Sequence, residues 1–165
     1  MQQILVYSDS LSWGIIPTSR RRLPFDQRWP GAMEIALCAA GKKVRVIEDC
    51  LNGRRTLWDD PLRDGRNGLI GLAQRIEIHS PLALVLLALG TNDFQAMHDN
   101  NAAQSAQGIA ALISAIVPFG GKIGGGATTR IGGTGMPGSS GAVRMAEMSA
   151  AMPCADCAAL LSCMA

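Results

Sequence analysis

Three short polar stretches each follow a hydrophobic run and contain the groups that acyl chemistry requires. They are Ser8-Asp9-Ser10-Leu11-Ser12, the segment "DCLNGRRT" at 49–56 and the segment "GTNDF" at 90–94. A serine hydroxyl such as that of Ser10 can attack an ester carbonyl, and the substrate oxygen that gains negative charge needs hydrogen-bond donors already aimed at it. The candidate donors are the backbone N–H groups of Ser10 and Gly53 and the side-chain amide of Asn92. A glycine suits the second position because its backbone can approach a substrate closely.

These stretches need a scaffold, and the first 117 residues alternate strand-like and helix-like patterns. The predicted strands cover residues 4–7, 44–47 and 82–89, and the predicted helices cover 30–40, 69–78 and 102–117. Pro30 suits a first helical position, and Gly41 and Pro81 end the first two helices. The run at 82–89 is apolar on both faces, which is typical of a strand inside a parallel sheet covered by helices. The order βαβαβα predicts a doubly wound α/β domain, in which loops at the carboxyl ends of the strands meet along one edge.

The same residues resemble the sequence blocks of a known family. Ser8-Asp9-Ser10-Leu11-Ser12, Gly53 and Gly90-Thr91-Asn92-Asp93 resemble blocks I, II and III of the SGNH (GDSL) hydrolases, and "RLPFDQRWPG" and "VIEDCLNGRRT" look like the bacterial arylesterase branch. The resemblance covers residues 1 to about 117 and implies a flavodoxin-like, three-layer α/β/α fold. It implies a serine esterase that acts on small-molecule esters such as phenyl acetate, can also transfer acyl groups and needs no cofactor. It further implies Ser10 as the nucleophile, with Ser10, Gly53 and Asn92 forming the oxyanion hole.

Two features depart from the family pattern. Ser8 stands where the pattern has glycine, and we expect this position to tolerate the extra hydroxymethyl group. The family's general base is a His three residues after an Asp, near the C-terminus of a longer chain, and neither His79 nor His98 follows an Asp at that spacing. We expect His79 to be structural and His98 to face solvent near a helix start, with the alternative that His98 reaches Ser10. Without the base we expect at most trace turnover of phenyl acetate.

Composition sets further limits on the function. The chain has 165 residues, 48% of them hydrophobic, which is enough for one globular domain with a core. A formal net charge of +2 gives no reason to expect a nucleic acid or a membrane as a partner. No charged region followed by a long apolar run stands at the N-terminus, so we expect a cytoplasmic protein. Cys154 and Cys157 lack a second pair or nearby histidines, so we expect no metal site.

The pattern changes after Val117. Residues 118–165 are rich in glycine and alanine, begin "PFGGKIGGGATTRIGG" and lack both the strand and the helix period. They are interpreted either as a low-complexity linker or as the product of a shifted reading frame. In both cases the two strands that the family adds after the third have no visible counterpart. We therefore expect the strand at 82–89 to form an apolar sheet edge, which favours aggregation or self-pairing into a homo-oligomer unless the tail or a partner covers it.

Two other functions stay open from the sequence alone. One is a non-catalytic α/β module whose Ser- and Gly-rich loops bind a small anion or acyl ligand. The other is a flavodoxin-like nucleotide binder, which the lack of a Walker or dinucleotide glycine motif disfavours. The sequence does not decide whether Arg54 and Arg55 contact a substrate or another subunit. We expect Asp9 and Asp93 to order their loops by hydrogen bonds rather than to react.

Overall fold

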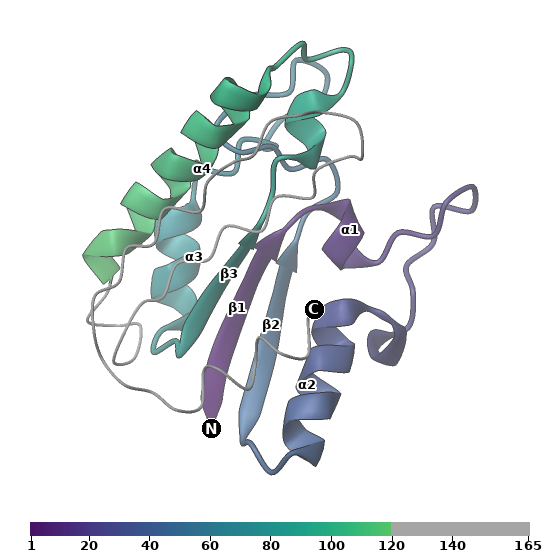
Figure 1. Ribbon diagram of the computed structural model, residues 1–165, viewed down its shortest axis with the longest axis vertical. Coiled ribbons are helices and arrows are strands. Elements are labelled where there is room, and N and C mark those ends of the chain that lie inside the picture. The colour runs from purple at the N-terminus through teal and green to yellow at the C-terminus, as the bar shows by residue number, and fades with distance from the viewer. Residues whose placement is uncertain (120–165) are drawn as a thin grey trace.

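The computed structural model describes residues 1–119, which form a three-stranded parallel sheet with helices on both faces (Figure 1). The strands are β1 (Gln2–Ser8), β2 (Val44–Cys50) and β3 (Leu84–Ala88), in the order β2-β1-β3 across the sheet. The helices are α1 (Ser10–Trp13), α2 (Trp29–Ala39), α3 (Leu72–His79) and α4 (Ala102–Ile116), with short 3₁₀ helices η1 (Phe25–Gln27), η2 (Thr91–Phe94) and η3 (Val117–Phe119). The frame-shift hypothesis and the C-terminal cysteines fall outside the described residues.

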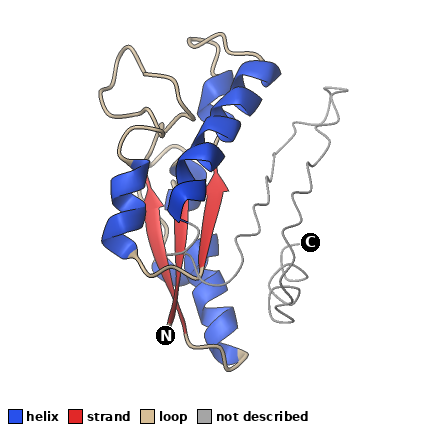
Figure 2. Cartoon of the chain, turned by 90° about the vertical axis from the view of Figure 1, so that its left-hand side faces the viewer, coloured by secondary structure: helices blue, strands red, loops and turns tan. Residues whose placement is uncertain are grey.

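β1 lies at the centre of the described sheet and is buried on both faces. Its side chains alternate, so that Leu5 and Tyr7 pack with residues of α3 and α4, while Ile4 and Val6 pack with residues of β2 and α2. α2 therefore covers one face of the sheet, and α3 and α4 cover the other (Figure 2). This arrangement confirms the predicted three-layer α/β/α fold.

The predicted strands and helices are present, with different ends. The first two strands reach further than 4–7 and 44–47, because β1 and β2 pair without a break from Gln2 with Val44 to Ser8 with Cys50. The apolar run at 82–89 contributes fewer residues to the sheet than predicted, since Leu82 packs in the core before the strand begins. Hydrophobicity alone therefore located each strand but not its ends.

The two outer strands of the described sheet differ in sequence. β3 pairs with β1, and within residues 1–119 no strand pairs with its other side. All of its side chains are half-buried and none is charged. β2 carries Arg45, Glu48 and Asp49, and its Val46 N–H donates a 2.6 Å hydrogen bond to the Glu34 carboxylate of α2. Because charged residues usually protect sheet edges, β2 has the sequence of an edge strand and β3 that of an interior strand.

α4 is a capped, strongly apolar helix. Asn101 and Gln104 form a capping box, in which the Asn101 side chain accepts the Gln104 N–H at 2.9 Å and the Gln104 side chain accepts the Asn101 N–H at 2.8 Å. By length and composition alone, the segment Ala102–Phe119 is long and apolar enough to cross a membrane. Ile109 and Leu112 pack in the core with residues of β1 and α3. These contacts attach one face of α4 to the core, although only 17% of the segment Ala102–Phe119 is buried.

Gly108→Ala is expected to destabilise the protein, although alanine is the better helix former. An added Cβ at Gly108 would lie 1.9 Å from the Oγ1 and 2.5 Å from the Cβ of Thr56. Overpacking of this kind costs about 1–3 kcal/mol, which exceeds the gain in helix propensity of about 1 kcal/mol. Urea unfolding measures the change in the free energy of unfolding. Ala106→Gly, at an exposed position of the same helix, serves as the control because it measures the effect of helix propensity alone. Stabilisation by Gly108→Ala would contradict the close packing.

Candidate active site

Ser10 is the first residue of α1, just beyond the carboxyl end of the central strand β1. The Asp9 side chain caps α1, because its Oδ1 accepts a hydrogen bond from the Leu11 N–H at 3.0 Å. Gly14, with a φ of +81°, ends this short helix. Ser10 is half-buried, and neither its N–H nor its hydroxyl donates a hydrogen bond to another residue between 1 and 119. Both groups are therefore available to a ligand.

Gly53 lies in the loop that follows β2, and this loop is tied to the end of β1. The Leu51 N–H donates to the Ser8 carbonyl at 3.0 Å, and the Arg54 guanidinium donates to the same carbonyl at 3.1 Å. Gly53 is buried and has a φ of +79°, a conformation that side-chain-bearing residues rarely adopt. Its N–H makes no hydrogen bond within the described residues. The loop thus supplies a second unpaired donor.

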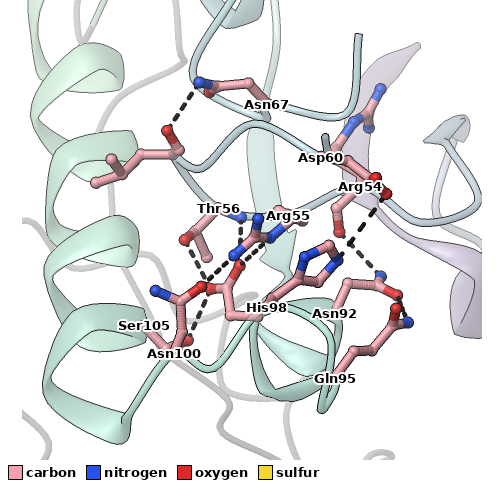
Figure 3. A network of polar contacts seen from close by, with 12 residues as sticks. Arg54, Arg55, Thr56, Asp60, Asn67, Asn92, Gln95, His98, Asn100 and Ser105 are labelled. Carbon is pink, nitrogen blue, oxygen red and sulfur yellow. Dashed lines mark hydrogen bonds and ion pairs between the residues drawn. The ribbon is translucent and has the colours of Figure 1, made fainter. Parts of the chain in front are cut away.

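The third predicted segment is η2, which follows β3 and contains the buried Asn92. Its amide Nδ2 donates to the Arg54 carbonyl at 3.0 Å (Figure 3) and to the Asp9 Oδ2 at 3.3 Å. Asp9 is the neighbour of Ser10, and Arg54 is the neighbour of Gly53. The structure therefore brings the three predicted segments together at one edge of the sheet.

The chain is similar to known proteins in sequence and in fold. No family model matches the chain. An arylesterase of Vibrio mimicus is 35% identical over 92 residues, which are 56% of this chain and 38% of that protein. The native aryl esterase of M. smegmatis superposes with a TM-score of 0.69 and 34% identity, over 75% of this chain and 58% of its own. A carbohydrate acetylesterase family member from Sinorhizobium meliloti does so with a TM-score of 0.65 and 36% identity, over 71% of this chain and 54% of its own.

A more distant structure has the same fold. It is AlinE4, an SGNH-hydrolase family esterase, with 21% identity and a TM-score of 0.53. The chain is therefore similar in sequence and fold to arylesterases and to a carbohydrate acetylesterase family member, and in fold alone to an SGNH-hydrolase family esterase. It spans 38% of the length of the Vibrio mimicus protein and between 54% and 58% of the M. smegmatis and Sinorhizobium meliloti structures.

Two buried arginines, Arg54 and Arg55, hold the loop after β2 in place. Arg54 and Arg55 are each 4% exposed, so neither of the predicted contacts, with substrate or with another subunit, describes them. The Arg54 guanidinium bonds the Asp49 carboxylate at 2.7 Å and lies 3.9 Å from the centroid of the Tyr7 ring. Arg55 lies 3.6 Å from the Asp93 carboxylate. Both side chains have a structural role, because each charge is paired within the same chain.

Asp9 orders the turn that carries Ser10, as predicted. Burial raises the pKa of Asp9, while the hydrogen bond from the Leu11 N–H and the nearby Arg54 charge lower it. The Asn92 amide that faces Asp9 is held in one orientation, because Gln95 Nε2 donates to its Oδ1 at 2.6 Å (Figure 3). The Nδ2 of Asn92 is therefore the side that faces the loops at Ser10 and Gly53.

Asp93 joins the loop after β2 to α4, which confirms its predicted role in loop order. Its side chain is fully buried. Its carboxylate accepts hydrogen bonds from the Thr56 hydroxyl at 2.7 Å, the Thr56 N–H at 3.2 Å and the Ser105 hydroxyl at 2.9 Å (Figure 3). Sequence reasoning missed Thr56 and Ser105, because a threonine in a loop and a serine in a helix give no local signal of a shared partner.

His98 is buried, so its predicted solvent-facing orientation is wrong. Its side chain is 1% exposed, and its Nε2 lies 3.9 Å from the Asp60 Oδ2 without a hydrogen-bond partner among the described residues. Burial, together with the Arg55 charge, lowers the pKa of His98 below its usual value, although Asp60 acts in the opposite direction. No hydrogen bond joins His98 to Ser10 within residues 1–119. The prediction failed because the segment 95–101 folds inward onto a loop some forty residues earlier in the chain.

Ser8 and His79 are both placed as the sequence predicts. The Ser8 hydroxyl is buried, shares a hydrogen bond with the Ser12 hydroxyl and donates to the Ala88 carbonyl at 2.7 Å, so the extra group is accommodated as expected. His79 ends α3, and its carbonyl accepts a hydrogen bond from the Gln3 side chain near the start of β1. This places His79 at the opposite end of the sheet from Ser10, in agreement with its predicted structural role.

Asp93→Asn is expected to lower the free energy of unfolding by about 3–5 kcal/mol, because Arg55 loses its carboxylate partner in a buried position. Urea unfolding provides the measurement. Asp64→Asn, an exposed substitution of the same kind, should change stability by no more than about 0.5 kcal/mol. Equal effects of the two substitutions would show that the buried network does not hold these loops.

His98→Gln is expected to reduce the loss of stability in mild acid. The pKa of His98 in the folded state lies below the ordinary value of 6.5, so the unfolded chain binds more protons as the pH falls. The free energy of unfolding must then decrease from about pH 7 to about pH 5, and glutamine at this position cannot titrate. Unfolding curves measured across this range should diverge for the two proteins, and parallel curves would contradict a buried neutral imidazole.

Proposed function

We propose that this chain carries the nucleophile and oxyanion hole of a serine carboxylic ester hydrolase of the arylesterase type. The observation that carries the proposal is the position of Asn92, whose amide bonds the residue beside Ser10 and the residue beside Gly53. The unpaired N–H groups of Ser10 and Gly53 support it. Small esters of the phenyl acetate type are the proposed substrates, since the relatives include proteins named arylesterase and aryl esterase.

In the proposed reaction, the Ser10 Oγ forms a bond to the ester carbonyl carbon, and the electron pair of the C=O π bond moves to the oxygen. The two N–H groups and the Asn92 amide stabilise this oxygen, and one such donor is typically worth about 10²–10³ in rate. The longer Asn92 bond, 3.3 Å to Asp9, is the one that the substrate oxygen replaces. The Ser10 proton passes to solvent. Collapse of the intermediate re-forms the C=O bond and breaks the bond to the leaving oxygen, which takes a proton from solvent and departs as the alcohol. Water, or a second alcohol, then attacks the acyl carbon and breaks its bond to the Ser10 Oγ, which is protonated again from solvent.

The proton of Ser10 needs an acceptor, and this sets the expected rate. The sequence contains no His three residues after an Asp. In serine proteases the oxyanion hole and substrate binding alone retain about 10³–10⁴-fold acceleration over water. We therefore propose that the chain acylates slowly at neutral pH and turns over phenyl acetate only in trace amounts.

Covalent labelling of Ser10 tests the proposal without requiring turnover. A p-nitrophenyl organophosphonate should add one phosphonyl group to the chain, detected by intact mass and located at Ser10 by peptide mapping. Ser10→Ala should remain unlabelled, and Ser19→Ala, which removes an exposed serine, should label at the rate of the unchanged protein.

Two other outcomes would change the assignment. Reversible binding of phosphate without labelling of Ser10 would favour the non-catalytic anion-binding module. Rapid turnover of phenyl acetate that Ser10→Ala abolishes would confirm the nucleophile and show that the chain contains a base of a different pattern.

A further inference from the structure

Arg63 is anchored beside the proposed oxyanion hole by a buried carboxylate. Its Nε and Nη2 donate to the Asp60 Oδ2 at 2.9 and 2.6 Å. The Asp60 side chain is fully buried, whereas that of Arg63 is 39% exposed. The Leu62 N–H donates to the other Asp60 oxygen at 2.9 Å, and this bond, with the Arg63 contact, lowers the pKa of Asp60. The carboxylate is therefore held as an anion, and the guanidinium is held in one place.

The same guanidinium lies directly against Gly53. A Cβ added to Gly53 would lie 2.6 Å from Nη1, 2.7 Å from Nη2 and 2.8 Å from Cζ of Arg63. Gly53 is thus required both by its positive φ and by the close approach of this side chain. At the next residue, the Arg54 carbonyl accepts the hydrogen bond from Asn92. The turn around Gly53 is therefore contacted by both Arg63 and Asn92.

We propose that Arg63 is a positioning residue for the oxyanion hole, a role that rests on the proposed function. Through its two bonds to Asp60, the guanidinium holds the Gly53 turn so that the Gly53 N–H points where negative charge develops. A planar guanidinium can bind the carboxylate with two N–H groups and still pack flat on a glycine, which an ammonium group cannot do. Preorganisation matters here because a donor must be aimed before the charge appears.

The rate of Ser10 labelling by a neutral organophosphonate tests this role. Arg63→Gln is expected to lower the maximal labelling rate by about tenfold, a fraction of what loss of a whole oxyanion donor costs, with little change in the inhibitor concentration for half-maximal rate. Arg63→Lys should be slowed to a similar degree, because lysine keeps the charge but not the two-point contact. Asp60→Asn should be slowed as well, since it removes the anchor and leaves Arg63 in place. Arg21→Gln, at an exposed loop position, should label at the original rate.

The outcomes separate this inference from the proposed function. If the unchanged protein is not labelled at Ser10, the proposed function fails. If it is labelled and Arg63→Gln reacts at the same rate, only the role of Arg63 is overturned. An unchanged labelling rate for Arg63→Lys would also overturn positioning by the guanidinium, because a positive charge alone would then be enough to hold the Gly53 turn. The melting temperature of each variant is measured as well. A slower labelling rate supports the role of Arg63 only for variants that still melt cooperatively.

Discussion

The buried pair Asn92 and Asp93 is the constraint on which the arrangement of the loops depends. The two residues are consecutive in η2 but make contacts in different directions, Asn92 with the residues beside Ser10 and Gly53 and Asp93 with Thr56 and Ser105. A buried carboxylate without partners is costly, so any movement of the loop after β2 or of α4 leaves a charge or a donor unsatisfied. One short segment therefore determines the positions of the loop after β2 and of α4 together.

The parts of the site that could be predicted are those with a local pattern. Ser10, Gly53 and Asn92 each follow an apolar run, and the topology of parallel strands is enough to bring their loops to one edge. The orientations of Arg55 and His98 have no such local signal. Arg55 donates a hydrogen bond to Asn100, and His98 lies beside Asp60, so each contact joins segments roughly forty residues apart. A sequence reading of single loops cannot give contacts of that range.

The strand ends were missed for a related reason. Glu48 and Asp49 read as loop residues because they are charged, yet both belong to β2 and pair with β1 through their backbone. Their charges are accommodated because Arg28 bonds Glu48 at 2.7 Å and Arg54 bonds Asp49 at 2.7 Å.

β3 presents the opposite case, because it is an uncharged strand at an outer position of the described sheet. α3 and α4 cover the same face of the sheet. Crossover connections between parallel strands are right-handed. A further parallel strand that followed α4 would therefore pair with the side of β3 that no strand within residues 1–119 occupies.

The loop after β2 is stabilised by three ion pairs, each between an arginine of the loop and a different carboxylate. They are Arg54 with Asp49, Arg55 with Asp93 and Arg63 with Asp60. The Arg54 and Arg55 pairs are buried, so desolvation offsets much of their attraction, but breaking one is expensive. The Arg63 side chain of the third pair is 39% exposed. They tie the loop to β2 through Asp49, to η2 through Asp93 and to itself through Asp60. All three pairs lie within residues 1–119, the part of the chain that also contains Ser10, Gly53 and Asn92.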